Sequence, residues 1–594
     1  MLSRVRLFSP PKHPVLSLAV QAALFDGDPQ ERSQFQVLVR HFLDRFFTNE
    51  TTSSDGETKA RALQIAYAIA LPGLCVAIYL FPPYHYPGGR PFWLQISDHY
   101  FYVMYSFVAI GAITIFVWDF FFPDLLDVFV LSTLSIQRQT LFWARVSAVV
   151  LFLGIFLLGA NALGSLFFPA SADLPSLARH FFAHLVAVTM SGAFIAAFFL
   201  ALQGSLLTLL GERISRTISP FLQGLSVTGL LTMLLIFPIV SRFLEALLSS
   251  GGREVQYFPP FWFLGIYERL LRGSSTLPVF ATLARTGWIA TAFMIAMASL
   301  FYPFAYRSRM RHVVEGADPR NTQNRILIPL TSVLHKTLLR IPQRRAIFHF
   351  ISQTLLRTPR YRVYLTMYGG GGMALVIAGV VMLKLGDGHI SLVFSPDGLR
   401  AAIPIIAFWT IAGLRAAFLG PADRKVNWIF RVINGKPGWD ESTATRWWVL
   451  LWALILTLGS VTLIHAIAPP GFNGWSNTGV QVFVGISLCL LLTDAFFLNV
   501  KMVPFTGARP ASTTNLAFVL IQYFGLFPPL VLLTLGLEDW LLQGLGHLLI
   551  VAALVVGAHF ELLRRHRRIV TDFLGLIEVD EEEEEFPQRL GLRY

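Results

Sequence analysis

The side chains that could carry chemistry in this chain are few, and most lie within or beside long apolar runs. His180 and His184 are four residues apart, a spacing that puts both on one helical face, as two ligands of a metal ion would be. No H-E-x-x-H pattern accompanies them, and the sequence names no third ligand. We interpret them as interfacial histidines and predict no metal site. His465, His547 and His559 are interpreted as hydrogen-bonded packing residues.

The patterns of nucleotide-binding proteins and hydrolases are missing from the sequence. No G-x-x-x-x-G-K-[ST] loop and no G-x-S-x-G elbow is present. The glycine run Gly369 to Gly372 is followed by apolar residues, so we expect close helix packing or a flexible helix start there, not a phosphate site. The chain is therefore predicted to hold no cofactor and not to be an enzyme.

Two ionisable residues, Arg415 and Asp494, stand inside apolar runs, where charge is costly in lipid. Both are within about two turns of the predicted inner interface, so snorkelling is the simpler interpretation. A proton-coupled transporter is expected to carry more ionisable groups near mid-span. Secondary transport stays open as an alternative in which these two residues are essential.

The composition defines the class of protein that must position these residues. Of 594 residues, 54% are apolar and only 14% are charged, with a mean hydropathy of +0.59, whereas soluble domains carry about 25% charge. This predicts an all-α polytopic membrane protein. The net charge of +12 is typical of basic cytoplasmic loops, not of a nucleic-acid partner. Cys75 and Cys489 lie in apolar runs and predict no disulfide framework.

Twelve windows are long and apolar enough to cross a bilayer. They are 62–81, 101–118, 146–168, 182–210, 221–241, 287–306, 366–385, 401–419, 447–468, 478–498, 516–537 and 541–560. With both termini inside, 38 Lys and Arg residues fall in inner segments and 8 in outer ones, which is the bias expected of a correct topology. The N-terminal stretch, interrupted by prolines, is interpreted as a cytoplasmic tail rather than a signal peptide.

The spans divide into two halves of six. The long inner segment between them carries twelve basic residues and two acids. We expect five regions: a cytoplasmic tail and interfacial helix (1–61), a first six-helix half (62–306), a basic cytoplasmic linker with an amphipathic helix (307–365), a second six-helix half (366–560) and a cytoplasmic basic and acidic tail (561–594).

Both halves begin with an amphipathic pattern, typical of a helix in the membrane interface. Its apolar positions are Phe35, Leu38, Val39, Phe42, Leu43 and Phe46 before the first span, and Ile347, Phe350, Ile351, Thr354 and Leu355 before the seventh. The second span of each half leads into a charged inner segment with embedded aromatic residues, 119–145 and 415–446. The same order of elements thus occurs twice, which indicates a repeat of pattern.

The outer segment 242–286 contains a dense aromatic cluster after two prolines, and it is too short to cross a bilayer. We expect a re-entrant or interfacial segment with Pro259, Pro260, Trp262 and Tyr267 at headgroup level.

The inner segment 119–145 is too charged for a span and too apolar for a solvated loop. Its run VLSTLSIQRQTLFWARV resembles that of ABC-2 type exporter permeases, in which an acidic residue precedes a Leu-Leu-Ser-Thr-Pro-Ile-Ser-like run and a Lys opens the next span. Here Leu134 replaces the Pro and Arg145 replaces the Lys. The later stretch LGPADRKVNWIFR also looks like long two-half bacterial permeases of this kind. The resemblance covers 30–306, and the second half fits in outline.

This resemblance implies the membrane subunit of an ATP-driven exporter in the bacterial inner membrane. A separate ATPase subunit on the cytoplasmic face would bind ATP, and 119–145 would couple it to the spans. The implied coupling residues are Asp124, Asp127, Ser132, Thr133, Ser135 and Arg138, with Asp423, Arg424, Lys425 and Trp428 in a second such segment. The two aspartates would face the cytoplasm, Phe129 and Val130 would pack into the interface, and the aromatic outer loop would form a lid.

Two alternatives and one further partner stay open. The chain could be an integral-membrane enzyme acting on lipid or lipid-linked substrates, with acid and base residues clustered at one interface, or it could be a secondary transporter. As a permease, one chain would form the whole pathway or would pair with a second copy in a homodimer.

Overall fold

The structure is a computed structural model of the chain. It describes residues 29–47, 58–123, 125–171, 176–250, 252–314, 339–386, 389–418, 439–467, 475–499, 504–505 and 516–573. These residues are almost entirely helical, and one two-stranded hairpin accompanies the helices. The predicted helical class is confirmed.

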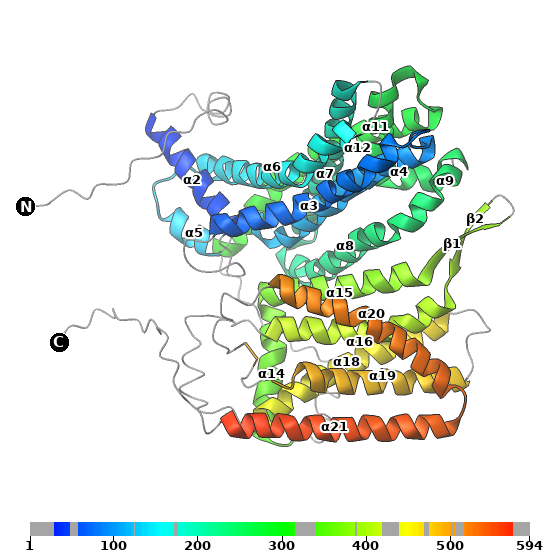
Figure 1. Cartoon of the computed structure of the whole chain (residues 1–594). Coiled ribbons are helices and arrows are strands. Elements are labelled where there is room, and N and C mark those ends of the chain that lie inside the picture. Colours follow the sequence, from blue (N-terminus) through cyan, green and yellow to red (C-terminus); the bar gives the residue numbers. More distant parts are fainter. Residues whose placement is uncertain are drawn as a thin grey trace, which may run out of the picture. The chain divides into compact units, whose positions relative to one another are not determined.

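The chain divides into two compact units, Met1–Ser215 with Gly251–Asp318, and Arg216–Ser250 with Pro319–Tyr594. The units do not follow the predicted halves, because the fifth predicted span, 221–241, belongs to the second unit. Figure 1 shows the elements of both units, and each unit is described by itself below.

The first unit is built from long helices joined by short ones. Its elements are α2 (Pro29–Phe47), α3 (Thr58–His85), α4 (Phe92–Phe116), η1 (Trp118–Phe120), α5 (Leu125–Ser132), α6 (Arg138–Ser171), α7 (Leu177–Leu209), α10 (Arg253–Tyr257), α11 (Pro259–Arg272), η2 (Gly273–Ser275) and α12 (Pro278–Val314). Helix α7 packs on α4 and α12, and α6 packs on α2 and α3. Small residues permit the close approaches: a Cβ on Gly73 of α3 would come within 3.4 Å of Gly164 in α6.

The second unit contains α9 (Leu244–Ser250), α14 (Pro342–Arg357), α15 (Pro359–Val380), β1 (Val381–Gly386), β2 (His389–Phe394), α16 (Pro396–Phe418), α18 (Trp439–Ile467), α19 (Trp475–Phe496), α20 (Leu516–Leu541) and α21 (Leu545–Phe573), and most of α8 (Gly211–Arg242). Helix α16 contacts α15, α18, α19 and α20, and α21 runs beside α19 (Figure 1).

The glycine run predicted to serve helix packing does so in the second unit. A Cβ on Gly372 would lie 2.8 Å from the Cβ of Trp409 in α16, and one on Gly370 would lie 2.9 Å from Val227 in α8. Gly413 of α16 approaches Tyr368 of α15 in the same way, at 2.6 Å. Any side chain at these positions would force the helices apart. Close packing is therefore confirmed for Gly370 and Gly372, whereas a Cβ on Gly369 would meet nothing within 4 Å.

Ten helices of the described residues are long and apolar enough to cross a membrane. They cover ten of the twelve predicted spans, which supports a multi-pass membrane protein. The other two windows, 366–385 and 516–537, fall on α15 and α20. Window 366–385 is wrong at its end, because α15 stops at Val380 and the next residues form β1. Strand β1 pairs antiparallel with β2 from Val381↔Phe394 to Gly386↔His389. An apolar run alone does not reveal this change from helix to strand.

The two amphipathic helices exist, but their apolar faces are covered by protein. Phe35, Leu38, Phe42 and Phe46 of α2 are buried, and α2 packs on α6. In the second unit Ile347, Phe348, Ile351 and Leu355 of α14 are buried, and α14 packs on α18. In each predicted half the interface helix therefore docks on the third predicted span. This supports the predicted repeat of pattern.

Candidate functional site

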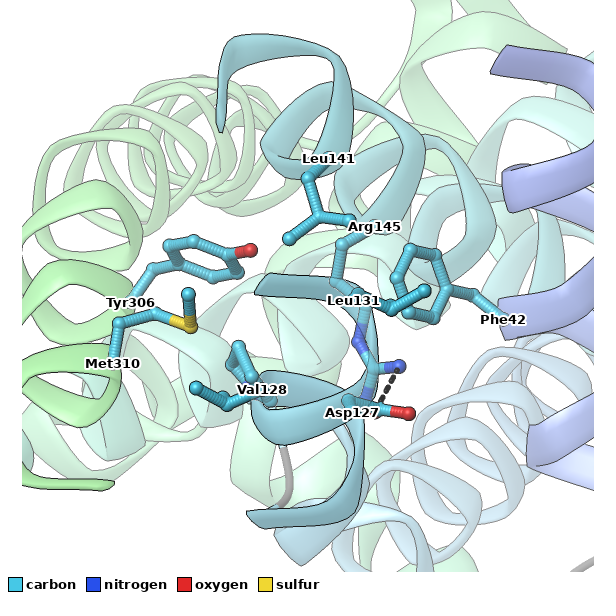
Figure 2. Close-up of a pocket in the computed structure, with 9 residues that line it drawn as sticks. Phe42, Asp127, Val128, Leu131, Leu141, Arg145, Tyr306 and Met310 are labelled. Atoms are coloured by element: carbon cyan, nitrogen blue, oxygen red, sulfur yellow. Dashed lines mark ion pairs between the residues drawn. The ribbon is translucent and has the colours of Figure 1, made fainter. Parts of the chain in front are cut away.

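The segment with the strongest sequence signal forms a junction of α2, α5 and α6 in the first unit. Figure 2 shows a small hollow there, with Asp127 and Arg145 facing each other and Tyr306 and Met310 of α12 on the opposite side. The remaining lining residues are Phe42, Pro123, Val128, Leu131 and Leu141. The hollow has room for roughly one water molecule, so it is not a substrate site.

Helix α5 is short because of what flanks it. Pro123 precedes it, and after Ser132 the chain turns through Thr133 to Gln137 before α6 begins. Thr133 Oγ1 donates to the carbonyl oxygen of Val130 at 2.8 Å, and Ile136 N donates to the carbonyl oxygen of Leu134 at 2.8 Å. The turn is therefore present although Leu134 stands where the exporter family usually has proline.

A buried ion cluster ties this short helix to its neighbours. Asp127 pairs with Arg45 of α2, and its Oδ2 lies 3.7 Å from Nη1 of Arg145 in α6. Arg145 also donates to the carbonyl oxygens of Phe120 and, at 3.1 Å, Phe122. The Asp127 and Arg145 side chains are 5% and 3% exposed. Arg145 thus connects α5 and α6 with the segment that follows α4.

Arg145 also contacts two aromatic rings of α2, and its charge disfavours a proton on the neighbouring His41. Its guanidinium lies 4.8 Å from the ring centroid of Phe42 and 5.2 Å from that of Phe46, a favourable cation–π geometry. His41 Nε2 lies 3.9 Å from Asp127 Oδ1. Burial, followed by the charges of Arg45 and Arg145, lowers the pKa of His41 below its ordinary value. The cation partners of Asp127 at neutral pH are therefore the two arginines.

One expectation for this segment is wrong. Asp127 does not face the cytoplasm, because it pairs with two arginines from other helices. Phe129 and Val130 are 55% and 59% exposed, and Leu134 is exposed beside them, so their packing into an interface stays a prediction. On a short helix only one face can be buried, and here it is the face of Asp127 and Val128.

The other predicted coupling residues are divided between exposed positions and undescribed ones. Thr133, Ser135 and Arg138 are exposed in the turn and at the start of α6. Asp124 lies outside the described residues, as does the side chain of Ser132. The second predicted coupling segment, with Asp423, Arg424, Lys425 and Trp428, also lies outside them.

Asp494 of α19 does not snorkel, contrary to the simpler interpretation of its position. It is buried and pairs with Arg446 of α18 and with His559 of α21, whose Nδ1 donates to Asp494 Oδ2 at 2.5 Å. One turn or two further along, His566 Nδ1 donates to the carbonyl oxygen of Leu498 at 2.6 Å. His559 is therefore a hydrogen-bond partner of Asp494, in agreement with its interpretation as a hydrogen-bonded packing residue. Three helices of the second unit meet at one carboxylate.

Arg415, the other predicted intramembrane ion, takes a different environment. It is partly buried near the end of α16, and its guanidinium lies 5.6 Å from the ring centroid of Phe497. Arg415 and Asp494 are not joined by an ion pair among those of the described residues.

The aromatic outer segment folds as α10 and α11, and α11 is embedded in the first unit. Pro259 and Pro260 start α11, where a missing N–H costs nothing. Trp262 Nε1 donates to the carbonyl oxygen of Gln256 at 2.6 Å. Helix α11 packs on α4, α7 and α12, and Tyr267 is fully buried. Tyr267 therefore faces protein and not solvent, and its expected position at headgroup level stays a prediction.

Sequence reasoning missed the buried polar side chains around α11. Tyr267 Oη lies 2.7 Å from His180 Nε2 and 3.1 Å from His184 Nδ1. His99 Nδ1 lies 2.5 Å from Glu268 Oε1, a contact between residues 169 positions apart. Only the helical spacing of the two α7 histidines was visible in the sequence. No group of three or more His, Cys, Asp or Glu within the described ranges is arranged to hold a metal ion.

No family model, curated protein or solved structure matches this chain. The functional argument therefore depends on the residues and contacts described above.

Proposed function

We propose that this chain is the membrane-spanning permease subunit of an ATP-driven, ABC-2-like exporter, and that a separate ATPase subunit docks on α5. The observation that carries the proposal is the two-sided character of α5. Its inner face is locked by Asp127 to Arg45 and Arg145, and its outer face presents Phe129 and Val130. A short helix that is fixed on one side and apolar on the other is suited to receive force from a partner.

The buried cluster would pass that force to the membrane helices. Arg145 belongs to α6 and also holds the carbonyl oxygens of Phe120 and Phe122, which follow α4. Displacing α5 alone would separate a buried charge pair, at a cost of about 3–5 kcal/mol. Movement of α4, α5 and α6 together avoids that cost. The junction would therefore act as one rigid coupling element between two states.

The partner's contact would be apolar, which revises the acidic contact expected from the sequence. Phe129, Val130 and Leu134 form a small exposed apolar surface next to the polar turn residues Thr133 and Ser135. A groove in the ATPase subunit would bury these three side chains. The same proposal puts the chain in the bacterial inner membrane with both termini in the cytoplasm, as one two-half pathway or as a homodimer.

The test uses the intact chain, co-purified with an ATP-binding-cassette ATPase encoded beside it and reconstituted in lipid. Phe129→Ser with Val130→Ser should lower permease-stimulated ATP hydrolysis at least about 10-fold, the loss expected when about 1.4 kcal/mol of contact energy is removed. Phe304→Ser on α12, equally exposed in the same unit, is the matched control and should not change it. Unchanged hydrolysis in the double variant, or no associated ATPase, would refute the proposal.

A second candidate is proton-coupled secondary transport, favoured by the buried Asp494 with Arg446 and His559. Buried acid–histidine pairs in membrane helices are a recurring form of proton site. In this case transport would stop when an uncoupler collapses the proton gradient, would survive ATP depletion, and would be abolished by Asp494→Asn. The exporter proposal predicts the opposite response to the first two treatments.

A further inference from the structure

A cluster of buried polar side chains joins α11 to α4 and α7 at the end of the first unit that is predicted to lie outside. We name it the outer histidine cluster, and it consists of His99, His180, His184, Tyr267 and Glu268. All five residues are essentially inaccessible to solvent. The ring of Tyr267 stacks on His99 with centroids 4.2 Å apart. The cluster forms the polar part of the surface through which α11 packs on α4 and α7.

The hydrogen bonds of Tyr267 bear on the protonation states of His180 and His184 in α7. The hydroxyl of Tyr267 has a single proton, yet it lies between His180 Nε2 and His184 Nδ1. It can donate to one ring and must accept from the other. His180 Nδ1 is buried without a hydrogen-bond partner, so a second proton on this ring would bury an unsatisfied charged donor. His184 is 1% exposed, so a charge on this ring would be buried as well. The closed arrangement therefore favours neutral rings at both positions.

Glu268, the acidic residue of the cluster, already has hydrogen-bond partners. Glu268 accepts from His99 Nδ1 at 2.5 Å and from Arg272 Nε at 2.7 Å. Burial would raise the pKa of Glu268, but the charges and hydrogen bonds of His99 and Arg272 outweigh it and lower the pKa, so the carboxyl group is ionised. Both oxygens of this carboxylate therefore already accept a hydrogen bond, one from His99 and one from Arg272.

The other charged and titratable groups around the two histidines are also paired. Asp98 of α4 accepts from Arg90 at 2.7 and 2.9 Å and from the hydroxyl of Tyr84 in α3 at 3.1 Å. Tyr102 of α4 donates to the carbonyl oxygen of Gly73 at 3.0 Å, and Arg179 donates to that of Leu270 at 2.9 Å. The charged and titratable groups that face His180 and His184 thus come from α3, α4, the loop between them, α11 and α7. Tyr84 lies on α3, Arg90 on the loop, and Asp98, His99 and Tyr102 on α4. Helix α11 contributes Tyr267, Glu268 and Arg272, and α7 itself contributes Arg179.

We propose that the outer histidine cluster is an acid-sensitive latch, in which protonation of His180 and His184 releases α11 from α4 and α7. Protonation would place two cations beside each other and beside Arg272, and among the described residues the neighbouring acids Asp98 and Glu268 are already paired. The rings accept protons only when α11 has moved away, so acid populates the open form. Movement of α11 would uncover the end of the first unit to a ligand or to water. The latch does not depend on the coupling role of α5.

Linkage gives the size and sign of the effect. The open form binds protons at the ordinary histidine pKa of about 6.5, whereas the closed form binds none at these two rings. The opening equilibrium constant should therefore rise by roughly 30-fold between pH 6.5 and pH 5.5, about 5-fold from each histidine.

Hydrogen–deuterium exchange of the full chain in lipid nanodiscs tests the latch. Amide protection of α11, corrected for intrinsic exchange, should fall by roughly 30-fold from pH 6.5 to pH 5.5. Protection of α16, a helix of the second unit without histidine, should stay constant and serves as the internal reference. Constant protection of α11 over this range would overturn the proposal.

Variants identify the responsible rings. His180→Gln with His184→Gln keeps hydrogen-bonding groups and removes the titration, so the acid response of α11 should disappear. Each single variant should retain about a 5-fold response. The single variants therefore test the proposal even if the double variant is not monodisperse. His85→Gln, on the exposed end of α3, is the matched control and should keep the full response. A full response in both single variants would show that other groups drive any opening.

Discussion

The two units use an arginine at the same helical position for different purposes. Arg145 and Arg446 both lie seven residues beyond the first residue of their helices, α6 and α18. Each pairs with a buried aspartate. In the first unit that aspartate is Asp127 on the short connecting helix α5, whereas in the second unit it is Asp494 on the long helix α19.

The difference suggests two roles for such a charge pair under the proposed function, transmission of motion and fixation of a bundle. A pair made to a connecting helix would pass movement of that helix to α6. A pair made to another long helix, and shared with His559 of α21, holds three long helices at one point. We therefore expect the first junction to control coupling and the second to control stability or proton binding.

The largest effect is expected from removing the two aspartates and comparing the losses. Asp127→Ala should destabilise the first unit by about 3–5 kcal/mol, because Arg145 is 3% exposed and its charge cannot reach water. Asp494→Ala should cost less, since Arg446 and His559 are 11% and 25% exposed. Denaturant unfolding in detergent micelles measures both. Equal losses would remove the distinction between the two junctions.

Replacing the first pair by apolar residues separates charge from packing. Asp127→Leu with Arg145→Met should recover stability to within about 1–2 kcal/mol of the natural chain, because a buried pair contributes little beyond a well-packed apolar substitute. Arg45 is a quarter exposed and can turn to solvent. Stimulated ATP hydrolysis should nevertheless fall, as the tie to the Phe120 and Phe122 carbonyl groups is lost. Full hydrolysis would show that packing alone transmits the movement.

A smaller effect is expected at the attachment of the second amphipathic helix. Trp448 Nε1 of α18 donates to Ser352 Oγ of α14 at 2.8 Å. Trp448→Phe removes this hydrogen bond and keeps an aromatic ring, so a loss of about 0.5–1.5 kcal/mol in unfolding free energy is expected. Trp447→Phe, an exposed neighbour on the same helix, is the control. A loss above that of Asp127→Ala would mean that α14 is the more firmly held interface helix.

The smallest effect concerns pH and His41. Its pKa is lowered in the folded chain, by burial first and then by Arg45 and Arg145. The unfolded chain therefore binds a proton more readily, and the contribution to stability is lost as pH falls below the ordinary value of about 6.5. His41→Gln should make the decline of thermal stability between pH 7 and pH 5.5 slightly shallower. His85, the last residue of α3, is the control, and a steeper decline in His41→Gln would contradict the sign.

Several features of the fold could be predicted because they are local. Apolar runs located ten of the described long helices, the 3.6-residue pattern located α2 and α14, and the glycine run indicated close packing. The end of α15 could not be predicted, because hydropathy does not distinguish the helix from the strand that begins at Val381.

The sequence alone determined the class of this protein and the residues whose chemistry stands out, because hydropathy, helical spacing and charge bias depend on near neighbours. The tertiary structure decided what those residues contact. Asp127 turns inward because arginines arrive from α2 and α6, and Asp494 meets His559 from 65 positions away. His180 and His184, interpreted from the sequence as interfacial, are buried because α11 brings Tyr267 between them. Burial and pairing of a charge depend on which helices pack together, and that is not a local property of the chain.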